Sequence, residues 1–97
     1  MTTPRPLAFL ALVPTVASFN GVIVILYFND NAPPHFHARH GEHETLVTIA
    51  PTAVFAGKLP AAVTKDVLAW ASRHTAELMT NWQRCQAHQP VFPIVYP

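Results

Sequence analysis

Four histidines lie within nine residues of this chain, and they are the side chains best suited to move protons or bind metal ions. His35, His37, His40 and His43 all fall within residues 32–44. Imidazole titrates near neutral pH and ligates transition metals through either ring nitrogen. The rest of the chain is mostly apolar. The sequence therefore indicates where a functional site would lie, but it says much less about which reaction or ligand that site serves.

The segment around the histidines has the pattern of a β-hairpin spanning residues 35–49, with Gly41 and Glu42 as its turn. This register predicts the cross-strand pairs His40–His43, Arg39–Glu44, Ala38–Thr45 and His37–Leu46. Side chains alternate across a strand. One face then carries His35, His37, Arg39, Glu44, Leu46 and Thr48, and the other carries Phe36, Ala38, Val47 and Ile49. We expect the second, apolar face to pack against the core.

Metal binding is one interpretation of the histidine face. A His-x-His pair on a strand places its two imidazoles about 6.5–7 Å apart on one side, which is close enough for His35 and His37 to share an ion. Glu44 or a residue of the C-terminal helix would supply a third ligand. Because His-x-His alone is a weak signal, no metal centre is assigned, and the sequence requires no cofactor.

Phosphodiester cleavage is a second interpretation, and its catalytic candidates are His35, His37 and Arg39. The two histidines would act as general base and general acid, and the arginine would stabilise the charge that develops on phosphorus. The near-neutral net charge argues against such a ribonuclease, so whether the chain is an enzyme stays open.

A structural role is the third interpretation. His35 would hydrogen-bond to carbonyl groups in the loop before it, His37 would pack against a tryptophan of the helix, and His40 and His43 would be solvated. His74, farther along the chain, is expected to be a core histidine with one satisfied ring nitrogen, or else a distant companion of His35 and His37. Buried imidazoles with satisfied hydrogen bonds are common in folded proteins.

Composition limits the partners of the protein. The 97 residues are 51% hydrophobic and only 11% charged, whereas soluble domains have about 25% charged residues. We therefore expect a second copy or a small partner protein to cover part of the apolar surface. A net charge of +1 disfavours binding to duplex DNA, and it supports RNA binding only weakly.

Cys85 is the single cysteine, which excludes an internal disulfide and fits a reducing compartment.

Residues 1–13 are expected to form an apolar N-terminal arm, followed by a single domain over residues 14–97. The arm resembles a signal peptide, but its positive charge is only Arg5, and Pro14 interrupts the apolar run. The same proline, with the polar residues after it, disfavours a membrane span. The expected location is the cytoplasm.

The elements predict an α+β domain with a small antiparallel sheet of 3–4 strands. Residues 22–28 are predicted to form a strand buried on both faces, residues 35–49 the hairpin, and residues 54–56 a short strand. One long C-terminal helix is predicted over about 60–88, because Pro60 suits a first turn and no proline or glycine follows before Pro90. Its apolar stripe would comprise Val63, Val67, Trp70, Ala71, His74, Leu78, Trp82 and Cys85.

Several motifs together resemble a known family. They include Tyr27-Phe28-Asn29-Asp30, Pro33-Pro34-His35-Phe36-His37-Ala38, Leu59-Pro60 and Glu77-Leu78-Met79-Thr80-Asn81-Trp82. The chain is similar to a bacterial domain family of unknown function with the Pro-Pro-His-Phe-His-Ala signature. The resemblance implies a compact cytosolic protein, often encoded beside a small partner in a toxin–antitoxin-like context. It points to His35 and His37 and away from His40, which stands where an aromatic residue is usual.

The function we expect from the sequence is a protein–protein interaction module in a toxin–antitoxin-like or regulatory pair. Its binding surface would be formed by His35, His37, Arg39 and Glu44. The alternatives are the histidine-dependent ribonuclease and the metal-binding protein described above.

Overall fold

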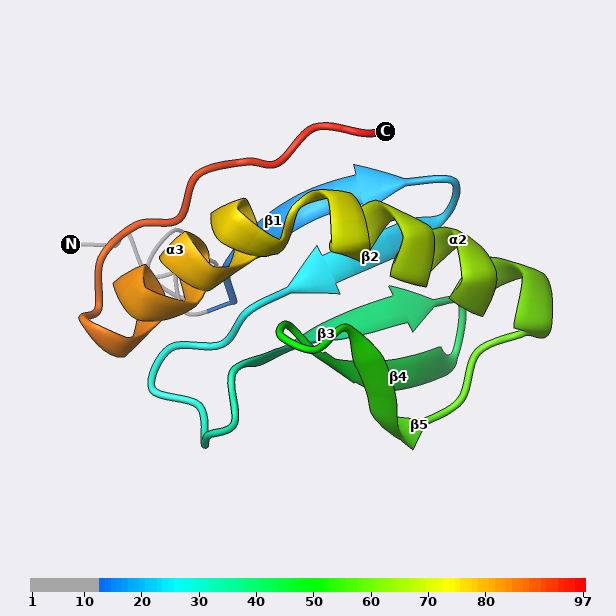
Figure 1. Cartoon of the computed structure of the whole chain (residues 1–97), viewed down its shortest axis with the longest axis horizontal. Coiled ribbons are helices and arrows are strands. Elements are labelled where there is room, and N and C mark those ends of the chain that lie inside the picture. Colours follow the sequence, from blue (N-terminus) through cyan, green and yellow to red (C-terminus); the bar gives the residue numbers. More distant parts are fainter. Residues whose placement is uncertain (1–12) are drawn as a thin grey trace, which may run out of the picture.

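The computed structural model describes residues 13–97, which form one antiparallel sheet and two helices (Figure 1). The elements are β1 (Thr15–Phe19), β2 (Val22–Ile25), β3 (His35–His40), β4 (His43–Thr48), β5 (Ala53–Gly57), α2 (Ala61–Arg73) and α3 (Thr75–Gln86). The strands lie in the order β1-β2-β3-β4-β5, so every strand pairs with its neighbour in the chain. The fold is therefore α+β, as predicted from the sequence.

The predicted count of 3–4 strands is wrong, because β1 adds a fifth strand at the edge of the sheet. Phe19 pairs with Val22 across a two-residue turn. The turn residues, Asn20 and Gly21, have φ values of 49° and 78°. A two-residue hairpin turn of this kind needs positive φ at both positions, and Asn-Gly provides it at low cost. The Asn-Gly pair is the sequence signal for this hairpin, but no strand was predicted in the residues that precede it.

The strand predicted over residues 22–28 is shorter and less buried than expected. β2 ends at Ile25, and the chain then enters the loop that leads to β3. Val22 and Val24 are fully buried, but Ile23 between them is 43% exposed. Ile23 is therefore open to solvent, whereas Ile25, on the same face of β2, is only 3% exposed, so burial on both faces is confined to the end of the strand.

The hairpin register predicted from the sequence is confirmed. His40 pairs with His43, Arg39 with Glu44, and His37 with Leu46. Gly41 begins the turn with a φ of +61°. The face predicted to be apolar is the core face: Phe36, Ala38, Val47 and Ile49 are all buried.

The single long helix predicted over about 60–88 is in fact two helices separated at His74. The backbone of His74 has φ −125° and ψ 27°, which is outside the helical region. No proline or glycine marks the break. The imidazole of His74 lies against the Trp70 ring and contacts the Pro97 carbonyl oxygen, so tertiary contacts accompany the break. The predicted apolar stripe continues across it, because all its members are buried except the half-buried Val63.

The C-terminal segment after α3 runs back along the body of the domain (Figure 1). The Ile94 backbone N–H donates to the Val16 carbonyl of β1 at 2.7 Å. The Trp70 indole N–H donates to the Val95 carbonyl at 3.0 Å. The segment therefore covers the β1 edge of the sheet and part of the helical layer.

The predicted apolar arm falls, except for Val13, outside the described residues. No helix within residues 13–97 has both the length and the apolar composition needed to cross a membrane.

Candidate functional site

Two of the four clustered histidines meet the carboxylate of Asp30. This residue lies in the loop between β2 and β3, which folds back toward the start of β3. The Nε2 atoms of His35 and His37 lie 3.0 Å and 3.2 Å from the same Asp30 Oδ2. One ligand-type atom from each residue lies within 4.8 Å of the others, so the three groups could hold a metal ion.

The other nitrogen of each imidazole also faces an oxygen atom. Nδ1 of His35 lies 2.8 Å from the Pro33 carbonyl oxygen. Nδ1 of His37 lies 2.9 Å from Oε2 of Glu44, its neighbour across the hairpin. Each ring is therefore held at both ends and has a fixed orientation.

Aromatic rings enclose the two histidines. The His35 ring lies between Trp82 of α3 and Phe55 of β5, with centroid distances of 5.4 Å and 5.3 Å. The edge-on partner of His37 is Tyr27, at 4.6 Å. The prediction that His37 packs against a helix tryptophan is therefore wrong, because His35 holds that position. His35 is only 5% exposed.

Asp30 is positioned from two sides. Its Oδ1 accepts a hydrogen bond from the Asn31 backbone N–H at 2.8 Å, and its backbone carbonyl accepts one from the Gln86 side chain at 3.0 Å. Burial by itself would raise the pKa of the Asp30 carboxyl. The Asn31 hydrogen bond and the contacts with His37 and His35 lower the pKa by more than burial raises it, so the pKa of Asp30 lies below its ordinary value. Asp30 is therefore an anionic ligand group at neutral pH.

The other predicted site residues lie at the rim or elsewhere. The Arg39 side chain is 54% exposed, and its Nε is 4.0 Å from Glu44 Oε2, which is a loose ion pair. His40 and His43 lie at the opposite end of the hairpin, beside its turn, and His43 is exposed. The four residues of the predicted binding surface therefore differ in exposure. His35 is buried, His37 is half-buried, and Arg39 and Glu44 form a loose ion pair at the surface.

His74 has a structural role separate from the cluster. It was expected to have one satisfied ring nitrogen, but Nδ1 contacts the Glu77 carboxylate and Nε2 lies 2.9 Å from the Pro97 carbonyl oxygen. The hydrogen bond to Glu77 raises the pKa of His74 above its usual value, although burial opposes the shift. The four-residue spacing of Arg73 and Glu77 suggests an ion pair between them, but Glu77 pairs with His74 instead.

The sequence interpretation missed Asp30. Asp30 was noted as part of a family motif and not as a ligand, and Glu44 or a residue of the C-terminal helix was named as the third ligand. The available signal was an acidic residue in the loop between two adjacent antiparallel strands, a few residues before His-x-His.

A groove between β5 and the start of α2 is a second candidate site. Its volume is about 510 Å³, and it is lined by Thr45, Val54, Gly57, Lys58, Leu59, Ala61, Thr64, Lys65 and Leu68. The lining is mainly apolar, and its two charged residues are both lysines. β5 is the outermost strand on this side of the sheet.

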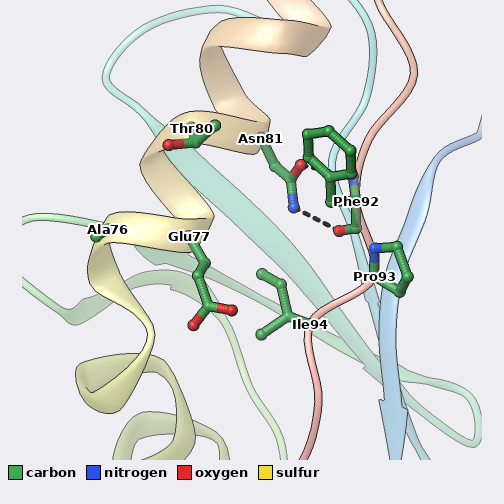
Figure 2. Close-up of a pocket in the computed structure, with 7 residues that line it drawn as sticks. All are labelled: Ala76, Glu77, Thr80, Asn81, Phe92, Pro93 and Ile94. Carbon is green, nitrogen blue, oxygen red and sulfur yellow. Dashed lines mark hydrogen bonds between the residues drawn. The ribbon is translucent and has the colours of Figure 1, made fainter.

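A third cavity, of about 340 Å³, lies between α3 and the C-terminal segment (Figure 2). Its wall includes Glu77, Asn81, Phe92 and Ile94. The Asn81 amide is bonded to the Phe92 backbone, as Figure 2 shows, and Glu77 is bonded to His74. Because these polar groups already join parts of the protein, this cavity is a weaker candidate than the other two sites.

The fold and sites define a small α+β domain with a five-stranded antiparallel meander, helices on one face and a partly buried Asp-His-His cluster. The chain belongs to the family described as Domain of unknown function (DUF4160), which matches residues 21–83. The matched stretch contains Asp30, His35, His37, and the strand and helix that form the groove. No curated protein and no solved structure gives a significant match.

Proposed function

We propose that this protein is a protein–protein interaction module that binds an extended segment of a partner in the groove between β5 and α2. The observation that carries this proposal is the edge of β5. β5 is the last strand of the sheet and has no further strand beside it within residues 13–97. An apolar groove lies directly next to it.

The two edges of the sheet differ. At the β1 edge, the protein's own C-terminal segment donates the Ile94 N–H to Val16. At the β5 edge, all five residues, Ala53–Gly57, are exposed, and the strand contains neither a charged residue nor a proline. Proteins usually block exposed edges with charges, prolines or bulges, because backbone groups there pair readily with another strand. β5 does contain one register shift, since Leu46 pairs with Ala56 and Val47 with Val54. Outside this bulge the edge has no charge and no proline, which favours docking of a partner strand.

The groove indicates which side chains such a strand would carry. When a segment adds to a sheet edge, its backbone provides affinity and its alternate side chains enter neighbouring pockets. Val54, Leu59 and Leu68 offer an apolar floor. Lys58 and Lys65 add positive charge, and the lining contains no acidic residue. The partner segment should therefore combine apolar side chains with carboxylates.

This proposal keeps the expected function and changes the location of the surface. His35 is too buried to contact a partner. A ribonuclease is less favoured, because both nitrogens of His35 and of His37 already contact protein oxygens. We further propose, from the family resemblance, that the partner is the product of an adjacent reading frame and that the pair acts in the cytoplasm.

Co-expression with the adjacent gene product and size-exclusion chromatography test the proposal. The two proteins should elute together, and Val54→Asp or Lys65→Glu should weaken the complex at least about tenfold, which corresponds to about 1.4 kcal/mol. Arg73→Glu, at the other end of α2, is the matched charge-reversal control and should leave binding unchanged. Separate elution, or equal effects of Lys65→Glu and Arg73→Glu, would contradict the proposal.

A further inference from the structure

We propose that Asp30, His35 and His37 form a binding site for a divalent transition-metal ion of the Zn²⁺ class. The ligands would be the Asp30 carboxylate and the Nε2 atoms of both histidines. These atoms come from a loop and a strand that follow each other in the chain and converge within 4.8 Å. The proposal is independent of the β5 groove.

As neutral rings, His35 and His37 have fewer N–H donors than the acceptor atoms that face them. A carbonyl oxygen and an ionised carboxylate only accept hydrogen bonds, and a neutral imidazole has one N–H. His35 faces the Pro33 carbonyl on one side and Asp30 on the other. His37 faces Glu44 and Asp30 in the same way. Two neutral rings thus supply two protons to four contacts, and a cation beside Asp30 would replace both missing protons.

The outer contacts of the two rings match those of metal-binding histidines. A histidine that ligates a metal usually donates its other N–H to a carbonyl or carboxylate, which fixes the ring and leaves the ligating nitrogen unprotonated. The Pro33 carbonyl has this position for His35, and Glu44 has it for His37. Both Nε2 atoms are then free to bind an ion, and both are directed at Asp30.

The spacing of the three groups requires little rearrangement. Ligands at about 2.0–2.1 Å in tetrahedral geometry lie about 3.3 Å from each other. The two nitrogen-to-oxygen distances, 3.0 Å and 3.2 Å, are close to that value already, and the two histidine nitrogens lie within 4.8 Å of each other. The aromatic contacts of His35 and the hydrogen bonds to Asp30 hold the groups in place, so the entropic cost of assembling the site is small.

The ligand types restrict the metal. Two imidazoles and a carboxylate suit zinc, iron, cobalt, nickel or copper, whereas calcium and magnesium prefer oxygen ligands throughout. Cys85 is not a member of this cluster, and its buried thiol lies 3.7 Å from the Leu26 carbonyl oxygen. Three protein ligands leave at least one coordination position for water or another ligand, which is the arrangement of an open metal site.

The experiment uses the full chain without a purification tag, stripped with chelator and titrated with Zn²⁺ and with Co²⁺. Native mass spectrometry should show one ion per chain, and bound Co²⁺ should give visible absorption bands of low-symmetry coordination. Asp30→Asn should reduce the affinity at least about 100-fold. Glu44→Gln removes no ligand and alters the outer contact of His37 and the loose ion pair with Arg39. It should reduce the affinity about 10–100-fold and keeps the test valid if Asp30→Asn fails to fold.

His43→Ala is the matched control, because it removes an exposed histidine from the same hairpin. It should leave stoichiometry and affinity unchanged. The proposal is overturned if the stripped protein takes up no Zn²⁺ or Co²⁺. It is also overturned if Glu44→Gln and folded Asp30→Asn bind as tightly as the wild type, or if His43→Ala abolishes binding, which would indicate adventitious capture by surface histidines.

Discussion

The side-chain amide of Asn81 makes two hydrogen bonds with the backbone of Phe92, one in each direction. Its Nδ2 donates to the Phe92 carbonyl at 2.8 Å, and its Oδ1 accepts from the Phe92 N–H at 2.8 Å. Asn81 is 1% exposed. This pair joins α3 to the C-terminal segment, which in turn covers the β1 edge of the sheet.

Replacing Asn81 by alanine should lower the free energy of unfolding by about 2–3 kcal/mol, because both hydrogen bonds are lost and the Phe92 backbone keeps only partial access to water. Urea unfolding measures this change. Gln83→Ala, at an exposed position of the same helix, should change stability by less than about 0.5 kcal/mol. Equal stabilities of the two variants would show that the pair does not hold the segment.

Two glycines with similar backbone angles should respond differently to alanine. Gly57 and Gly41 have φ values of 75° and 61°, where a side chain costs about 1–2 kcal/mol. At Gly41 a Cβ would meet nothing within 4 Å, whereas at Gly57 it would overlap the Glu44 backbone oxygen. Thermal unfolding should therefore show a larger loss for Gly57→Ala than for Gly41→Ala. A larger loss for Gly41→Ala than for Gly57→Ala would contradict the close approach of the Gly57 backbone to Glu44.

The stability of the protein should fall with rising pH in a way that depends on His74. The pKa of His74 is raised in the folded state, first by the hydrogen bond to Glu77 and further by Pro97, against the effect of burial. A raised pKa stabilises the fold fully below the unfolded value of about 6.5, and the stabilisation is lost as pH rises through the folded pKa. Glu77→Gln should remove most of this dependence.

Urea unfolding of the wild type and of Glu77→Gln, from about pH 5.5 to about pH 8.5, isolates the contribution of His74, because the other titrating groups cancel in the difference. The wild type should be the more stable of the two at the acid end, and the difference should shrink toward the alkaline end. A difference that is constant across this range would contradict the assignment.

Cys85 should be inert in the folded protein. The thiol is fully buried, and burial raises its pKa to about 11. Because the thiolate is the reactive form, modification by a thiol reagent at about pH 8 should be slow. Its rate should rise in urea together with the unfolded fraction. Rapid modification without urea would show that the contact between α3 and the loop before β3 opens readily.

The sequence alone determined the local features of this domain. The Gly41-Glu42 turn and the alternation of apolar and polar residues determined the register of the central hairpin, because a one-residue shift would have put Phe36 and Val47 in water. The helical spacing of apolar residues identified the face carrying Trp70 and Trp82, since three- and four-residue steps return to one side of a helix.

The tertiary structure decided what these elements bring together. Asp30 reaches the histidines because the loop between β2 and β3 turns back toward the start of β3, and no spacing rule gives that distance. The helix divides at His74 where the ring meets Trp70 and the Pro97 carbonyl, at a position that local propensity would keep helical. Local patterns are governed by neighbours in the chain, whereas a site built from a loop, a strand and a helix depends on how the whole chain packs.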